Sequence, residues 1–337
     1  MDVTDLTESQ RYAAFLLANL LKLKDCALHA PESDRVTRTT VLPTTIDTVA
    51  DQPGLGLEFG VWRGRSINLC AAAQPDRTWV GFDSFEGFPE DGRIDWQKPF
   101  KVVDLPEVPE NVQLVKGYFS DTLPGFLEKN EKPVAFVNID CDIYSSTVDV
   151  FTALEAKGHL RPGLPIYFDE LVNYADALWN EMLALFQMLE RTGLGFRWLA
   201  LDKNLWLPRE TLEMIRDKTF PTWREQMGGS YWQQASLVLT EGGIDYGPLG
   251  DDQYLAEVKA LAALYEEVSD LRVVRAEELR IQKAKEREEF EKRRAVIMEE
   301  RRQDRLKLQK ERQAANLAKR REEQARARAD ARAARTT

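Results

Sequence analysis

Histidine and cysteine are scarce in this sequence, which has two histidines and three cysteines in 337 residues. The cysteines, Cys26, Cys70 and Cys141, are far apart and odd in number, so they predict neither a disulfide framework nor a zinc site. His29 follows a predicted helix and His159 lies in a predicted turn, so we expect structural roles for both and no histidine base.

No apolar run approaches the roughly 20 residues of a membrane span. The first residues also lack the basic start of a signal peptide, and we therefore expect a cytoplasmic protein without a membrane span.

Phosphate-binding signals are also missing. The chain has no Gly-x-x-x-x-Gly-Lys loop, which argues against a phosphohydrolase. Charge is unevenly distributed: residues 1–250 contain 23 basic and 37 acidic residues, whereas residues 251–337 contain 23 and 19. An acid-rich body does not attract polyanions, so we expect no nucleic-acid partner.

A strand–helix–strand unit organises the middle of the chain. Residues 134–139 and 166–168 are short, apolar and rich in β-branched or aromatic side chains, which predicts inner strands of a sheet covered on both faces. Residues 145–157 carry apolar side chains at helical spacing, so the two strands should be parallel neighbours. Each strand ends in acids, Asp140-Cys141-Asp142 after the first and Asp169-Glu170 after the second.

Neighbouring parallel strands would bring these acids together at one edge of the sheet, where open α/β sheets bind ligands. Carboxylates at such distances repel one another unless a cation lies between them, and oxygen ligands favour Mg²⁺, Mn²⁺ or Ca²⁺. The alternative is that Asp140, Asp142, Asp169 and Glu170 are solvated loop acids, some of them capping helices.

A glycine-rich turn precedes this unit. Residues 55–59 predict a strand, Gly60 and Gly64 a turn, and Ser66 the start of a helix. Such a turn exposes backbone N–H groups and suits a nucleotide-type ligand. A second strand ends in Asp83, where an acid commonly accepts hydrogen bonds from ribose hydroxyls. The alternative is that the glycines form plain turns and that Asp83 caps a turn with Ser84.

The remaining elements follow from periodicity. We predict helices at 7–28 and 177–191, a long loop at 85–109, and strands at 112–115, 196–201 and 235–240. Thr7 or Ser9 would cap the first helix. The segment between the last two strands is rich in aromatic residues, Trp206, Trp223, Tyr231 and Trp232, which belong either to the core or to a substrate wall. We favour the core for most of them.

Beyond Gly250 the sequence favours one long helix. Residues 254–268 keep an apolar spacing of three and four that suits a helix docked on the body of the protein. Further on, pairs such as Glu288 with Lys292 and Glu289 with Arg293 support a solvated helix. No apolar seam lasts three heptads, so we favour a solvated helix over a coiled coil. A homo-oligomer or a protein partner held through residues 251–335 is left open.

Taken together, five motifs in order resemble the class I S-adenosylmethionine-dependent methyltransferases, and more narrowly the macrocin-type (TylF-like) O-methyltransferase family. They are Glu58-Phe59-Gly60-Val61-Trp62-Arg63-Gly64-Arg65-Ser66, Gly81-Phe82-Asp83-Ser84-Phe85-Glu86-Gly87-Phe88-Pro89, Thr122-Leu123-Pro124, Ile139-Asp140-Cys141-Asp142-Ile143-Tyr144-Ser145-Ser146-Thr147 and Phe168-Asp169-Glu170. The resemblance implies an α/β, Rossmann-like methyltransferase fold. We therefore expect a mostly parallel, seven-stranded sheet with helices on both faces, plus the long charged C-terminal helix.

The resemblance also assigns roles to residues. The cofactor S-adenosylmethionine would contact the glycine turn and the acid after the second strand, at Glu58, Gly60, Gly64, Ser66, Asp83 and Ser84. Asp140, Asp169 and Glu170 would hold Mg²⁺ or another divalent cation, and Asp142 matches the family's proposed general base. Many members have two aspartates where this chain has Asp169-Glu170.

The predicted organisation is an N-terminal helical cap at 1–40, a methyltransferase domain at 41–245 and a charged helical extension at 251–335. The predicted function is metal-assisted transfer of a methyl group from S-adenosylmethionine to a hydroxyl of a sugar or another small molecule, the acceptor being a small molecule or a glycan. Two alternatives remain. One is a catalytically inactive scaffold that assembles through its long helix, and the other is a different α/β enzyme with an acid-bound metal.

Overall fold

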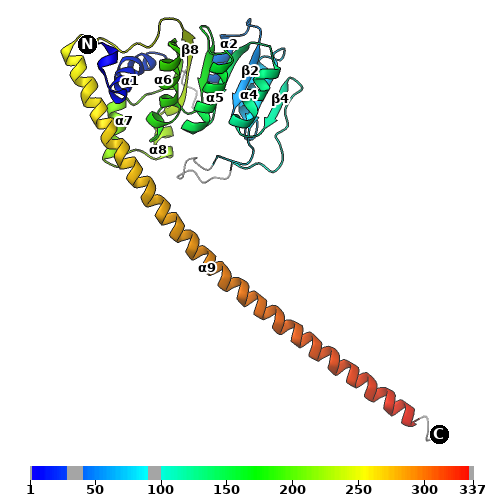
Figure 1. Cartoon of the computed structure of the whole chain (residues 1–337). Coiled ribbons are helices and arrows are strands. Elements are labelled where there is room, and N and C mark those ends of the chain that lie inside the picture. The colour runs from blue at the N-terminus through cyan, green and yellow to red at the C-terminus, as the bar shows by residue number, and fades with distance from the viewer. Residues whose placement is uncertain (1, 29–40, 90–99, 334–337) are drawn as a thin grey trace. The chain divides into compact units, whose positions relative to one another are not determined.

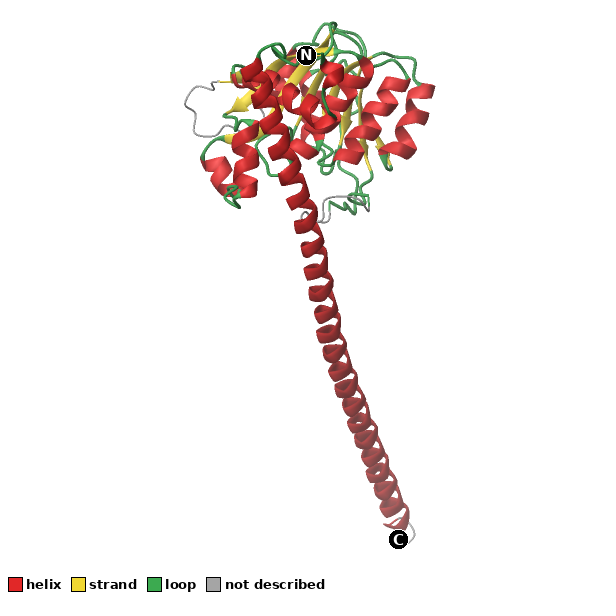
Figure 2. Cartoon of the chain, turned by 60° about the vertical axis from the view of Figure 1, so that its left-hand side comes forward, coloured by secondary structure: helices red, strands yellow, loops and turns green. Residues whose placement is uncertain are grey.

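The computed structural model describes residues 2–28, 41–89 and 100–333. His29 and the middle of the predicted 85–109 loop lie outside the described residues. The chain divides after Val273 into two compact units. The first unit holds a central sheet with helices on both of its faces (Figures 1 and 2).

The sheet has eight strands in the order β1-β7-β8-β6-β5-β2-β3-β4. Strand β8 is antiparallel to both neighbours, and the other pairs are parallel. The predicted α/β class and mostly parallel sheet are confirmed. The strands are β1 (Ala27–Leu28), β2 (Leu55–Phe59), β3 (Trp79–Asp83), β4 (Val112–Lys116), β5 (Val134–Ile139), β6 (Pro165–Phe168), β7 (Gly195–Lys203) and β8 (Tyr231–Thr240).

The additional strand is β1, which occupies the end of the predicted 7–28 helix. The helix itself, α1, spans Glu8–Lys24 and begins where the Thr7 hydroxyl accepts a hydrogen bond from the Gln10 N–H. Ala27 and Leu28 then pair in parallel with Leu201 and Asp202 at the edge of the sheet. The sequence periodicity does not reveal this change from helix to strand, because pairing with β7 at the edge of the sheet determines it.

The other helical elements connect and cover the strands. They are α2 (Val41–Asp47), α3 (Arg65–Ala73), α4 (Phe119–Lys129), α5 (Tyr144–Ala156), α6 (Glu181–Thr192), α7 (Pro208–Arg216), α8 (Trp223–Gly228), α9 (Asp252–Ala333) and the short 3₁₀ turns Val3–Asp5 and Ala177–Trp179. The predicted 177–191 helix is broken at Asn180, whose φ of −105° and ψ of −116° are not helical. The break places Glu181 at the start of α6.

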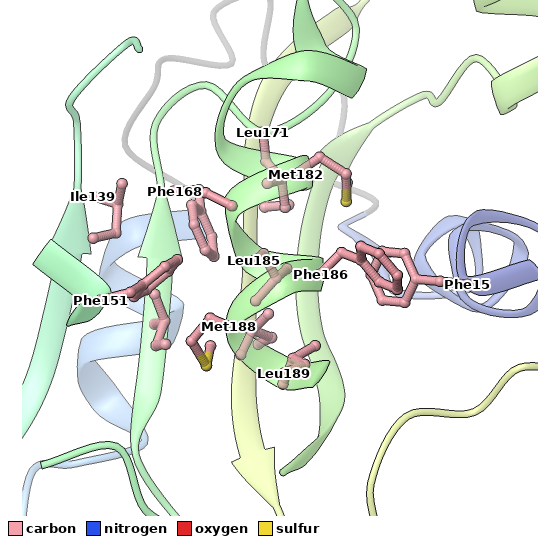
Figure 3. Close-up of a cluster of buried hydrophobic side chains, with 14 of the residues drawn as sticks. Phe15, Ile139, Phe151, Phe168, Leu171, Met182, Leu185, Phe186, Met188 and Leu189 are labelled. Atoms are coloured by element: carbon pink, nitrogen blue, oxygen red, sulfur yellow. The ribbon is translucent and has the colours of Figure 1, made fainter. Parts of the chain in front are cut away.

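One face of the sheet packs on α5 and α6. Figure 3 shows Ile139, Phe151 and Phe168 beside the apolar face of α6, all of them buried. On the other side of α6, Phe186 lies 5.2 Å from Phe15 of α1 between ring centroids. Each buried side chain of this size contributes about 1.5–3 kcal/mol of transfer free energy. This packing fixes the strand ends from which the acidic motifs emerge.

The prediction that the aromatics between the last two predicted strands belong mostly to the core is wrong. Trp206, Tyr231 and Trp232 are only half-buried, and Trp223 is 47% exposed. Trp206 stacks on Tyr231 with ring centroids 4.0 Å apart. The reason is that α7 and α8 form a separate layer over the end of the sheet, where rings pack on one another.

Helix α9 begins in the first unit, where Val258, Leu261 and Val268 are buried as the apolar spacing predicted. Residues 274–333 form the helix of the second unit, and the predicted ion pairs Glu288–Lys292 and Glu289–Arg293 are present in it. Exposed pairs of this kind contribute about 0.3–0.5 kcal/mol each. None of the described helices is long and apolar enough to cross a membrane.

Candidate active site

A cavity of about 1250 Å³ opens beyond the carboxyl ends of β2, β3, β5 and β6. Seven of the predicted site residues line it: Gly60, Asp83, Ser84, Asp140, Asp142, Asp169 and Glu170. Glu58, Gly64 and Ser66 do not line the cavity and lie at or beneath the glycine turn. The cavity is therefore lined both by residues predicted to bind the cofactor and by the acids predicted to bind the metal or act as the base.

Asp83 holds the glycine turn in place. Its Oδ2 accepts hydrogen bonds from the N–H groups of Val61 and Trp62, at 2.9 and 2.7 Å, and its Oδ1 accepts one from Phe85 at 2.6 Å. A carboxylate has about four lone-pair sites, so one remains for a ligand hydroxyl. Ser84 supports the same loop, because its hydroxyl donates to the Gly87 carbonyl at 2.7 Å.

Residue 60 must be a glycine for two reasons, its backbone conformation and the close approach of another backbone segment. Its φ is +98°, and a Cβ placed on it would lie 1.8 Å from the carbonyl oxygen of Asp140. The turn after β2 and the acidic turn after β5 are thus in direct backbone contact. Gly64, with a φ of +77°, caps α3 in the left-handed region that glycine adopts without strain.

Glu58 is fully buried beneath the turn. Its Oε1 accepts a hydrogen bond from the Ser66 hydroxyl at 2.9 Å, and its Oε2 accepts one from the Asn138 amide at 2.7 Å. Burial raises the pKa of Glu58 to about 8, although both hydrogen bonds oppose that shift. Glu58 and Ser66 therefore fasten β2 to α3 and β5, and their side chains shape the turn from below.

The acids of the two later motifs meet as the strand pattern predicted. β5 and β6 are parallel neighbours with Ile139 opposite Phe168, so Asp140 and Asp169 follow at the same level of the sheet. Asp169 is oriented through its Oδ1, which accepts hydrogen bonds from the Tyr167 hydroxyl at 2.9 Å and the Gln234 amide at 3.2 Å.

Asp142 stands in a strained turn. Its φ is +61°, and the Ile143 N–H donates to the Cys141 carbonyl at 2.8 Å, which closes a three-residue γ-turn around it. Strain of this kind is common where a side chain must be aimed at a ligand. Burial raises the pKa of Asp142 well above its ordinary value, and the charges of Glu170 and Asp140 and a hydrogen bond with Glu170 add to that effect.

The donor set suits a divalent cation. Four carboxylates line this part of the cavity, and no lysine, arginine or histidine is among the described residues that line it. Oxygen donors of this kind are the ligands of hard cations. Within the described ranges, however, no three His, Cys, Asp or Glu side chains are grouped so that they could hold a metal ion. The residue types fit Mg²⁺, while the side chains are not arranged as a finished ligand cage.

Comparison with known proteins finds a family model that resembles part of the chain. Residues 35–176 match the family model described as macrocin O-methyltransferase (TylF). This stretch of the chain is similar to that family. The matched segment contains the glycine turn, Asp83 and all four acids, and the Rossmann-like methyltransferase fold predicted for the family is the one observed.

Solved structures of similar proteins include two methyltransferases. CalS11, a calicheamicin methyltransferase, is 25% identical over 58% of this chain and 89% of its own, with a TM-score of 0.40. TomG, the O-methyltransferase of Streptomyces achromogenes involved in tomaymycin synthesis, is 17% identical over 70% of this chain and 91% of its own, with a TM-score of 0.36. No curated protein matches the sequence.

Glu181 is a buried acid of the same domain that the sequence analysis overlooked. Its Oε1 accepts a hydrogen bond from the Cys141 N–H at 3.4 Å, whereas its Oε2 has no hydrogen-bond partner within the described residues. Burial is the largest cause that raises its pKa well above the ordinary value, and Glu170 adds to it. An acid at the start of an amphipathic helix looks like an ordinary helix-terminus residue. Only the break at Asn180 reveals that it supports the acidic turn.

We expect Glu58→Gln to flatten the pH dependence of stability. The pKa of Glu58 rises from 4.5 to about 8 on folding, so the carboxyl group costs stability progressively as pH rises between those values. Glutamine is never charged, and the Oδ1 of Asn138, which no described residue contacts as a donor, can accept from its amide after a flip of the Asn138 side chain. Melting temperatures of both proteins between pH 5 and about pH 9 would check this. Equal slopes in the two proteins would show that Glu58 does not titrate on unfolding.

Proposed function

We propose that this protein is a metal-assisted O-methyltransferase that transfers a methyl group from S-adenosylmethionine to a hydroxyl of a sugar or another small hydroxylated molecule. One observation carries the proposal. The glycine turn with its acid Asp83 and the acidic motifs of β5 and β6 line the same cavity. Its volume of about 1250 Å³ leaves room for two ligands side by side.

The cofactor would occupy the end of the cavity near β2 and β3. Gly60 lets a ligand approach the backbone, and Asp83 keeps an acceptor for a ribose hydroxyl. Ser84 supports the adjoining loop, and Glu58, Gly64 and Ser66 hold the turn from below. In this assignment Glu58, Gly64 and Ser66 maintain the shape of the glycine turn and do not contact the cofactor themselves.

The acidic end of the cavity would carry out the chemistry. The acceptor oxygen attacks the methyl carbon of the sulfonium; a C–O bond forms, the C–S bond breaks, and neutral S-adenosylhomocysteine leaves. The proton of the acceptor hydroxyl passes to a carboxylate oxygen of Asp142, which lines the cavity. Asp140, Asp169 and Glu170 would hold a divalent cation, which when bound balances the carboxylate charges and lowers the pKa of the hydroxyl.

Calorimetric titration with S-adenosylmethionine tests the cofactor site. We expect the wild-type protein to bind it and Asp83→Ala to bind at least about 10-fold more weakly, because the turn loses its acceptor and the ribose its partner. Asp76→Ala, an exposed acid in the loop before β3, is the matched control and should bind normally. Failure of the folded wild-type protein to bind the cofactor would refute the proposal.

The proposal includes the predicted division of the chain into a cap, a methyltransferase domain and a helical extension. Residues 41–245 would carry the reaction, residues 1–40 would cover them, and residues 251–335 would serve assembly, with themselves or with a protein partner. An inactive scaffold remains the alternative function. Binding of S-adenosylmethionine without turnover of any hydroxylated acceptor would favour it.

A further inference from the structure

The loop between β6 and α6 connects two parts of the candidate active site. Tyr174 and Ala175, near the middle of the loop, line the cavity. At the end of the loop the chain breaks at Asn180, and Glu181 follows, which accepts a hydrogen bond from the Cys141 N–H of the acidic turn. The position of this loop therefore affects both the cavity wall and the support of the acidic turn.

Helix α9, which follows the predicted methyltransferase domain, holds this loop through one of its faces. Tyr265, Ser269 and Arg272 are spaced by four and three residues, so they share that face. The Trp179 ring of the loop stacks on Tyr265 with centroids 5.1 Å apart and 12° between the planes. Its Nε1 donates a hydrogen bond to the Ser269 hydroxyl at 2.8 Å. The Arg272 guanidinium lies 4.0 Å from the centroid of the Trp179 ring, so Trp179 contacts all three residues.

Arg272 also forms an ion pair with the loop. Its Nε and Nη2 both donate to the Oδ1 of Asp176, the former at 2.8 Å. The two side chains are only 27% and 22% exposed, so water and salt screen this pair less than an ion pair on the open surface. Helix α1 holds the same loop, because the Tyr12 hydroxyl donates to the Leu178 carbonyl at 2.8 Å. The loop is therefore fixed by two helices that lie outside the predicted 41–245 domain.

The part of α9 that contacts the loop is itself anchored to the body of the protein. It lies within the first compact unit, which extends to Val273. Val258 and Val268 are fully buried, and the Tyr254 hydroxyl contacts the Ala14 carbonyl of α1 at 3.2 Å (Figure 1). An anchored helix can hold a short loop in one position, whereas a solvated helix cannot.

We propose that Arg272 and Trp179 are positioning residues for the methyl transfer. They hold the loop at 174–181 and, through it, the cavity wall at Tyr174 and the acidic turn at Glu181. Neither is among the residues that line the described part of the cavity, so both act through the loop. The first turns of α9, up to Val273, then belong to the active domain, whatever the later residues of the helix assemble with.

Hydrogen–deuterium exchange of the full-length protein tests the hold on the loop. Arg272→Met keeps an unbranched side chain but removes the charge and the donors. It should speed exchange in peptides over 174–181 and 140–143 about 10-fold or more, because local opening loses a charge-assisted contact. Exchange over the glycine turn at 59–66 should not change, since Asp83 holds that turn. Lys259→Met, at an exposed position of α9, is the matched control and should leave all three segments unchanged.

Asp176→Asn is a milder variant that removes only the partner charge, and it decides the question if Arg272→Met does not fold. It should speed exchange in the same two segments. Unchanged exchange over 140–143 would overturn the proposal, because α9 would then not act on the acidic turn. A uniform rise across the whole domain would overturn it as well, since the ion pair would then serve general stability.

The reaction provides a second readout, and this part of the proposal rests on the proposed function. With an acceptor that the wild-type protein methylates, Arg272→Met should lower kcat about 10-fold, because misplaced groups cost rate. The affinity for S-adenosylmethionine should not change. A variant that keeps the wild-type kcat would overturn the positioning role. Failure of the wild-type protein to bind the cofactor would instead refute the proposed function, and the exchange measurements would still show whether α9 holds the loop.

Discussion

Asp142→Asn is expected to lower the rate of methyl transfer by about 10²–10⁴-fold, the range typical for loss of a general base. Asparagine has the same shape and adopts a positive φ readily, so the γ-turn around residue 142 should persist. It cannot accept the hydroxyl proton, however. The rate of S-adenosylhomocysteine formation, measured with any acceptor that the wild-type protein methylates, checks this prediction.

The matched control for this variant is Asp149→Asn, since Asp149 also lines the cavity but lies exposed on α5. It should retain most of the activity, and both variants should bind S-adenosylmethionine as the wild type does. An Asp142→Asn protein that keeps nearly full activity would remove Asp142 from the role of base. A variant that loses the cofactor instead would show that residue 142 serves the turn and not the proton transfer.

Gly60→Ala should destabilise the domain by about 4 kcal/mol or more, a size reserved for severe steric or backbone conflicts. A Cβ at residue 60 would meet the Asp140 carbonyl oxygen at 1.8 Å, and the residue would have to keep a φ of +98°. Each 1 kcal/mol shifts the melting temperature by about 2–4 °C in a domain of this size. A thermal melt should therefore show a fall of roughly 8 °C or more, with cofactor binding lost.

Gly125→Ala offers a control with the opposite sign. Gly125 lies inside α4 without a positive φ, and a Cβ added to it would meet no described atom within 4 Å. Alanine there should stabilise the domain by about 0.5–1 kcal/mol, because glycine is the poorer helix former. If Gly60→Ala melted like the wild type, the close contact between the two turns would not exist in solution.

Much of the site could be predicted from local patterns. The apolar runs before Asp140 and Asp169 and the helix between them fix two parallel neighbours, and parallel neighbours bring their carboxyl ends together whatever the rest of the chain does. The position of Asp83 could be predicted by applying the same rule to β2 and β3. The predicted pairing of the strands was therefore sufficient to predict that these residues lie in one cavity.

What escaped prediction depends on contacts between distant segments. Glu181 looks like an ordinary residue of an amphipathic helix until the break at Asn180 puts it beneath the acidic turn. Gln226 and Gln233 are polar residues in an aromatic-rich stretch, and only the folding of α8 and the start of β8 places them in the cavity wall. Strand β1 is decided in the same way, by pairing with β7.

The contact between Gly60 and the Asp140 carbonyl has a consequence for redesign of the protein. The glycine turn after β2 and the turn that carries the acids after β5 form one backbone unit, so neither can be reshaped without disturbing the other. The wall containing Phe220, Trp223 and Gln226 comes from a separate layer between β7 and β8. New acceptor preferences are therefore best sought by exchanging that layer, with the two turns left as they are.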